Sequence, residues 1–91
     1  MFARISTYKM KQDLIAEAET KLEAMMPQIM AMAGLKSFTN VIDEQGNGVV
    51  VSVLESEEVS NASQEQVGQI WAAFSEYMEV PPSVNGYRVL A

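Results

Sequence analysis

Five side chains of this chain stand out as ones that could hold a small organic molecule. Trp71 is the only tryptophan, Phe74 follows it at helical spacing and Tyr77 lies in the same predicted helical region, so their rings could stack against an aromatic ligand. Asn40 and Arg88 could add polar contacts, since an arginine in a dry cleft stabilises negative charge on oxygen. Each also has a simpler explanation, because aromatic residues at helical spacing commonly form core and an arginine near a strand end commonly pairs with a surface carboxylate.

Tyr8 and Tyr77 could donate a proton to a ligand, although a buried tyrosine more often bonds a backbone carbonyl. Ser6 and Thr7 precede Tyr8, and no His or Lys is evidently placed to activate them. We therefore expect no serine or threonine nucleophile.

Metal ligands are scarce in the sequence. The chain has no Cys and no His, which excludes thiolate and imidazole ligands and an axial histidine for haem. The acidic residues lack the alternating Asp/Asn pattern and the glycine of a calcium loop; they are Asp43, Glu44, Glu55, Glu57 and Glu58. Glu57 and Glu58 are better explained as acids in the first turn of a helix. We expect no metal and no cofactor.

The length and the net charge of the chain indicate how many domains it forms and which partners are unlikely. The 91 residues predict a single domain over residues 1–91, and without disulfides a domain of this size commonly gains stability by pairing with a copy of itself. The net charge of −6 repels phosphate and anionic lipid, so we expect a homodimer with no nucleic acid and no membrane partner. No signal pattern opens the chain, and we expect a cytoplasmic location.

The elements that must position the candidate residues can be predicted from hydrophobic period and turn signals. Strands are predicted over 2–9, 36–43, 48–55 and 84–91, and helical regions over 11–26, 28–33 and 56–78. Pro27 is expected to kink or restart the first helix. Ser63 and Gln66 are expected to form a capping box within the second helical region, and the prolines after Val80 to end it.

The third predicted strand carries a nearly continuous apolar run over residues 49–54. A strand with one wet face should alternate apolar and polar residues, so this strand is expected to be covered on both faces. The helices can cover one face, and a second copy of the chain is the simplest cover for the other.

The order of elements, βαββαβ, is the split pattern of ferredoxin-like folds: an α+β domain with two helices on one face of a four-stranded antiparallel sheet. Over nearly its whole length the chain resembles the dimeric α+β barrel superfamily, and within it the domains similar to antibiotic-biosynthesis monooxygenases. Local matches are Phe2–Ile5, Gly34–Leu35 after the long helix, and Val51–Glu58 leading into the second helical region.

The resemblance implies a barrel closed across a dimer, with a ligand cleft between the helices and the sheet of each subunit. Haem-degrading members use a His that this chain lacks, so that activity is not expected. Cofactor-free oxygenases of this kind use Asn, Trp, Tyr and Arg, and residues of these types are present here: Asn40, Trp71, Tyr77, Tyr87 and Arg88.

Two functions remain open at this point. The first is a small enzyme or binding protein that holds an apolar, aromatic or quinone-like molecule between helices and sheet, with cofactor-independent monooxygenase-like activity as one form of it. The alternative is a non-catalytic dimer with a structural or regulatory role, whose cleft is filled by its own side chains.

Overall fold

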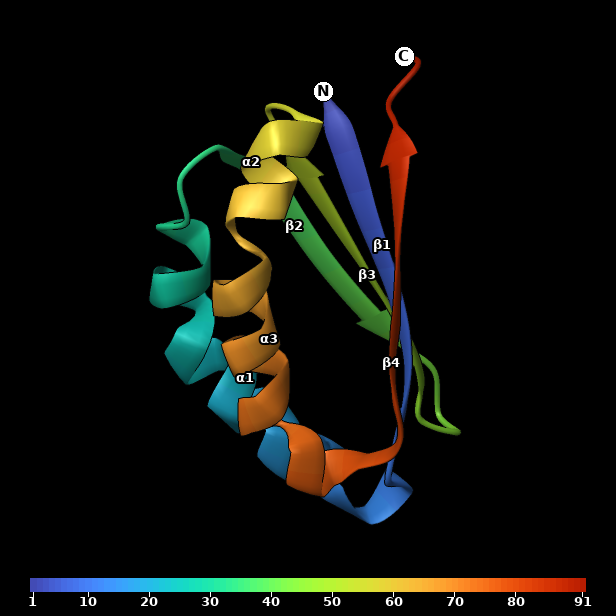
Figure 1. Ribbon diagram of the computed structural model, residues 1–91. Helices are drawn as coiled ribbons and strands as arrows, with labels where there is room; N and C mark the ends of the chain where they lie inside the picture. The colour runs from blue at the N-terminus through green and yellow to red at the C-terminus, as the bar shows by residue number, and fades with distance from the viewer.

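A layer of four antiparallel strands packs against a layer of helices in the computed structural model, which describes residues 1–91 (Figure 1). The strands are β1 (Phe2–Met10), β2 (Leu35–Ile42), β3 (Asn47–Leu54) and β4 (Met78–Arg88). The helices are α1 (Ile15–Met30), α2 (Glu57–Ala62) and α3 (Gln64–Ala73), with 3₁₀ turns η1 (Gln12–Leu14) and η2 (Ser75–Tyr77).

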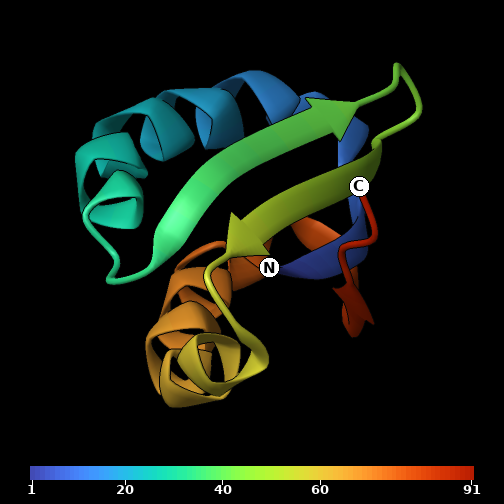
Figure 2. The ribbon, with the colours of Figure 1, turned by 90° about the horizontal axis from the view of Figure 1, so that it is seen from above.

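The sheet has the strand order β2-β3-β1-β4, so the predicted ferredoxin-like α+β fold is confirmed. All helices lie on one face of it. Viewed from above, α1 runs beside β2, and α2 contacts β1 and β3 (Figure 2). The central strands β1 and β3 pair without interruption from Phe2 opposite Leu54 to Lys9 opposite Asn47.

Side chains of β1 alternate between the two faces of the sheet. Arg4, Ser6, Tyr8 and Met10 face the helices, and all four are buried. Ile5 lies on the open face, opposite Val51 of β3. The open face also carries further apolar side chains, namely Val41, Val49, Val53 and Tyr87.

The first helix differs from the prediction at Pro27. The predicted alternative of a restart at Pro27 is wrong, because α1 continues to Met30 and the Ala31 N–H donates to the Pro27 carbonyl at 3.1 Å, whereas the alternative of a kink stays a prediction. Pro27 is exposed in the last helical turn, where water can replace the one backbone bond that proline lacks.

The second helical region is two helices, α2 and α3. Its N-cap is Ser56, whose Oγ accepts a hydrogen bond from the Val59 N–H at 3.2 Å. The predicted capping box at Ser63 and Gln66 is wrong. Ser63 has φ −97° and ψ 3° because it also ends α2, whereas an N-cap needs an extended backbone, and its hydroxyl donates to the Ser60 carbonyl instead.

The last helix ends earlier and the last strand starts earlier than predicted. Helix α3 stops at Ala73, and β4 begins at Met78 with both Pro81 and Pro82 inside it. Because β4 is an edge strand, a proline there need not remove a bond between strands. The prolines therefore lie within the strand and do not precede it.

The backbone conformation of the turn between β2 and β3 can be tested by substituting its glycine. Gly46 has φ +92°, and an added Cβ would overlap the Met10 carbonyl. Gly46→Ala is therefore expected to lower the free energy of unfolding by at least about 1–2 kcal/mol in urea titrations. Gly68→Ala is the matched control: a Cβ there meets no atom within 4 Å, and removing a helical glycine should raise stability by about 0.5–1 kcal/mol. Equal effects of the two substitutions would contradict this assignment of the turn.

Candidate functional site

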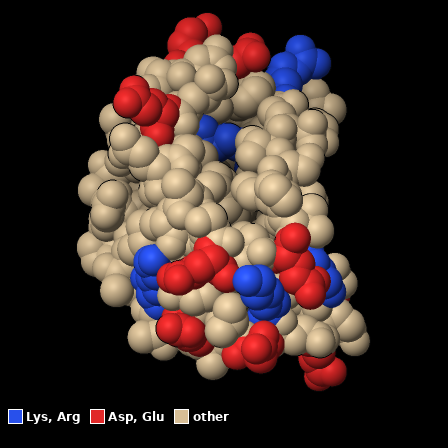
Figure 3. Space-filling view, turned by 60° about the horizontal axis from the view of Figure 1, so that its bottom comes forward, with Lys and Arg blue, Asp and Glu red and all other residues tan.

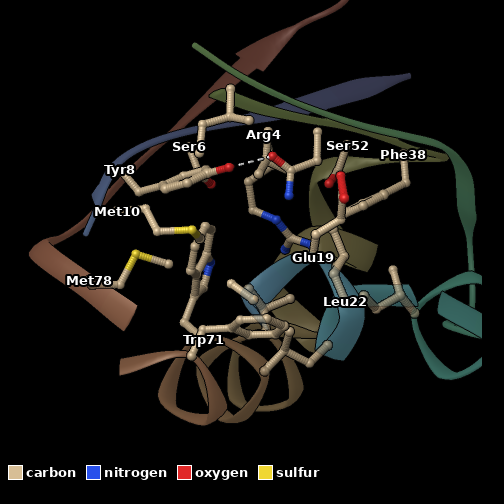
Figure 4. Close-up of a pocket in the computed structure, with 18 of the residues that line it drawn as sticks. Arg4, Ser6, Tyr8, Met10, Glu19, Leu22, Phe38, Ser52, Trp71 and Met78 are labelled. Carbon is tan, nitrogen blue, oxygen red and sulfur yellow. Dashed lines mark hydrogen bonds between the residues drawn. The ribbon is translucent and has the colours of Figure 1, made fainter. Parts of the chain in front are cut away.

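A cavity of about 150 Å³ lies between the helices and the sheet. It is lined by 21 residues, of which 16 are hydrophobic, so its walls are mainly apolar. They come from β1, β2 and β3 on one side and from α1 and α3 on the other, as the close-up shows (Figure 4). The cavity therefore occupies part of the space between the two layers that core side chains would otherwise fill.

A hydrogen bond between two side chains, one from β1 and one from β2, provides polar groups in the cavity wall. The Tyr8 hydroxyl of β1 donates to Asn40 Oδ1 of β2 at 2.7 Å (Figure 4). These strands are not neighbours, because β3 lies between them. Gly48 of β3 is opposite Tyr8, and an added Cβ at Gly48 would overlap the tyrosine ring. A glycine at this position thus lets the ring cross β3 and reach Asn40.

Aromatic rings form the helix side of the same region. The Trp71 and Tyr8 ring centroids are 5.7 Å apart with the planes tilted by 57°, an edge-to-face type of contact. Phe74 lines the cavity beside Trp71. Trp71 is only half-buried, so its indole forms part of the wall of the cavity without being enclosed by other side chains.

Burial affects the ionisation of Tyr8. Desolvation raises the pKa of Tyr8 above its ordinary value of 10.0, and the hydrogen bond with Asn40 acts in the opposite direction. The phenol is accordingly protonated at neutral pH and remains able to donate a hydrogen bond.

Arg4 is the only cationic side chain that lines the cavity, and it is only 7% exposed. Its Nη1 contacts neutral acceptors: the Ser60 carbonyl and Oγ at 3.4 Å each and Ser63 Oγ at 3.3 Å. No carboxylate pairs with it, and desolvation lowers the pKa of Arg4. Glu19, exposed on α1, is the one acid in the lining, and no ion pair joins it to Arg4.

The predicted site residues separate into two groups. Asn40, Trp71 and Phe74 lie together in the cavity wall. Tyr77 is buried next to Phe74, with ring centroids 6.0 Å apart, and does not line the cavity. Arg88 is exposed near the end of β4, opposite Phe2, and is also outside the cavity wall.

Four polar lining residues were not predicted from the sequence as site residues: Arg4, Ser6, Glu19 and Ser52. A signal for two of them is present in the alternation of β1. Arg4 and Ser6 have the same parity as Tyr8, so polar side chains occupy the face of the strand that the helices must cover. Polar residues on the strand face that the helices cover indicate a cavity with polar groups in its wall more than a core packed with apolar side chains.

The structure contains no metal-binding cluster and no helix able to span a membrane. No three His, Cys, Asp or Glu side chains gather in a way that could hold a metal ion. None of the helices combines the length and the apolar character needed to cross a bilayer.

No protein-family model and no curated protein sequence matches the chain, whereas solved structures match it over nearly its full length. A protein of unknown function from Nitrosomonas europaea has a TM-score of 0.84 at 17% identity, covering 99% of this chain and 89% of that one. A second protein from Nitrosomonas europaea, provisionally described as an antibiotic biosynthesis monooxygenase, has a TM-score of 0.83 at 16% identity over 100% of both chains. An antibiotic biosynthesis monooxygenase has a TM-score of 0.80 at 9% identity, again over 100% of both.

At these identities the likeness establishes the fold and leaves activity open. The chain shares its ferredoxin-like α+β fold with these structures, several of which are described as antibiotic biosynthesis monooxygenases.

Proposed function

We propose that the cavity binds a flat aromatic or quinone-like small molecule, with its rings against Trp71 and Phe74 and a polar substituent at the Tyr8–Asn40 pair. The observation that carries this proposal is the Tyr8–Asn40 hydrogen bond, which places a protonated phenol and an amide in the wall of an otherwise mainly apolar cavity. Ligand sites commonly combine mostly apolar walls with a few fixed polar groups.

The alternative of a non-catalytic dimer has less support from the described residues. It requires a cleft filled by the protein's own side chains, whereas a cavity of about 150 Å³ remains between helices and sheet. Interiors that serve stability alone are packed to near-crystalline density, so an unfilled space of this size reduces stability and suggests another role.

Oxygenation is the finer form of the proposal. It rests on the similar structures described as monooxygenases, and it takes a substrate that supplies its own electrons. For an anthrone-like substrate, O₂ would convert a ring CH₂ to C=O and release water, and the two electrons and two protons would come from the substrate. Because the Tyr8 hydroxyl donates its hydrogen bond to Asn40 Oδ1, the amide Nδ2 of Asn40 would be the group that donates to the oxygen that develops negative charge.

We also propose that the open face of the sheet pairs with a second copy of the chain. Val41 and Tyr87 are 54% and 50% exposed on that face, and Ile5 and Val51 lie between them on the central strands. An apolar sheet face left in water favours association, because pairing removes apolar surface from solvent.

Ligand binding can be measured through Trp71, the only tryptophan. Titration with 2-naphthol or 1,4-naphthoquinone is expected to change Trp71 emission in a saturable way. Asn40→Ala should weaken binding by about tenfold, because the amide that orients the Tyr8 hydroxyl and leaves its own Nδ2 to donate to a ligand is lost. Thr39→Ala is the control, since Thr39 is exposed on the other face of β2. Absence of a saturable change with either compound, and with flavins and fatty acids, would contradict the proposal.

The protonated state of Tyr8 predicts a pH dependence of stability. Its pKa is raised in the folded state, so above about pH 10 the unfolded chain ionises first and stability falls as pH rises through the folded-state pKa. Tyr8→Phe should lose less stability than the wild type between about pH 9 and pH 11 in urea titrations. Tyr77 shifts in the same direction, and the comparison of the two proteins removes its contribution. Parallel pH profiles of wild type and Tyr8→Phe would show that Tyr8 is not desolvated.

The dimer proposal predicts a solution mass near twice 10.0 kDa by light scattering. Val51→Glu places a charge at the centre of the open face and should give a monomer with an unchanged circular dichroism spectrum. Ala72→Glu adds the same charge on the exposed side of α3 and should leave the mass at that of the wild type. A wild-type chain that stays monomeric at high concentration would refute the pairing.

A further inference from the structure

We propose that Arg4 is the ligand's anchoring residue and that it binds a carboxylate, which makes the ligand an aromatic organic acid. This inference rests on the proposed function, because it assigns the chemical class of the molecule in the same cavity. Arg4 was not among the site residues predicted from the sequence.

Arg4 carries a buried charge that the protein does not neutralise. It is 7% exposed, yet the chain's one ion pair joins Lys36 and Glu55 on the surface. Placing a cation in a buried position is costly unless it is paired. A bound anion would remove that cost, so the site favours a negatively charged ligand.

Most of the hydrogen-bonding capacity of Arg4 is unused. A guanidinium has five N–H donors, but only Nη1 contacts protein acceptors, at the long distances of 3.3–3.4 Å. No enclosed side-chain nitrogen lacks a partner, so Nε and Nη2 must border accessible space. A carboxylate matches this geometry because its two oxygens can accept from two nitrogens of the same guanidinium.

Arg4 also lies where two hollows of the molecule meet. One is the apolar cavity, and the other is an open groove lined by α2, α3 and the N-terminal part of β1 together with Val84 and Gly86 of β4. Arg4, Val67 and Trp71 line both. The space-filling view shows a hollow with basic atoms at its floor, surrounded by uncharged ones (Figure 3).

The two hollows together define the shape of the ligand. An aromatic body can occupy the apolar cavity against Trp71, while a carboxylate at Arg4 faces the polar groove, where Ser60 and Gln64 lie. Glu57 is the only acid of the groove, and no ion pair joins it to Arg4. The chain as a whole has a net charge of −6 and repels anions, so Arg4, the only cation that lines the cavity, is the specific point of attraction for an acid.

The test compares 2-naphthoate with its neutral isostere 2-naphthamide by isothermal titration calorimetry. The wild type is expected to bind 2-naphthoate about 10- to 100-fold more tightly, the range for a hydrogen-bonded charge. Arg4→Gln should abolish this preference while it retains binding of the amide. Lys36→Gln removes the same charge from the surface ion pair and should keep the preference.

The outcomes separate this inference from the proposed function. Equal affinity of the wild type for the two compounds would overturn the role of Arg4 and leave the aromatic site intact. Binding of neither compound would overturn both. The comparison of the two compounds with the wild type tests the role of Arg4 without any variant. If Arg4→Gln fails to fold, Arg4→Lys can replace it. This variant keeps the charge but not the planar guanidinium, and it should retain part of the preference for 2-naphthoate.

Discussion

The hydrogen bond from Tyr8 to Asn40 is the contact on which the site depends, because it joins two strands across a third. It requires that Gly48 have no side chain, that Tyr8 face the helices, and that β2, β3 and β1 keep their register. A shift of one residue in either pairing would turn Tyr8 or Asn40 to the open face. The bond therefore specifies the sheet register as well as the polar group in the cavity.

A cavity is a cost for a domain of 91 residues. Small domains bury a limited fraction of their surface, and each unfilled space forfeits contacts between side chains. The buried polar side chains add to this cost, since Arg4 is held only by long contacts to Ser60 and Ser63. Natural proteins retain such features where function requires them, which is the reason to assign the cavity and Arg4 to binding.

The sequence was sufficient for the order of elements, because strand and helix periods and the Gly-Asn-Gly turn are local signals. It was insufficient where local signals compete. Ser56 and Ser63 both suit an N-cap, and only the chain path decides that Ser63 ends α2. Aromatic type suggested both Trp71, which the structure places in the cavity wall, and Tyr77, which it does not. Arg4 lines the cavity and Arg88 does not, because the helices cover the strand position of Arg4 and leave that of Arg88 exposed. That distinction depends on tertiary packing and not on residue type.

The two faces of the sheet depart from the usual distribution of polar and apolar residues. In a two-layer α+β domain the helix-covered face is normally apolar and the open face polar. Here the covered face, although mainly apolar, also carries Arg4 and Asn40, while the open face carries Ile5, Val41 and Val51. A covered face of this kind suits ligand recognition more than core formation. The proposed pairing of the open face with a second copy would add apolar burial to that of the interior. The proposed binding inside each subunit and the proposed association between subunits would then both follow from one arrangement of side chains.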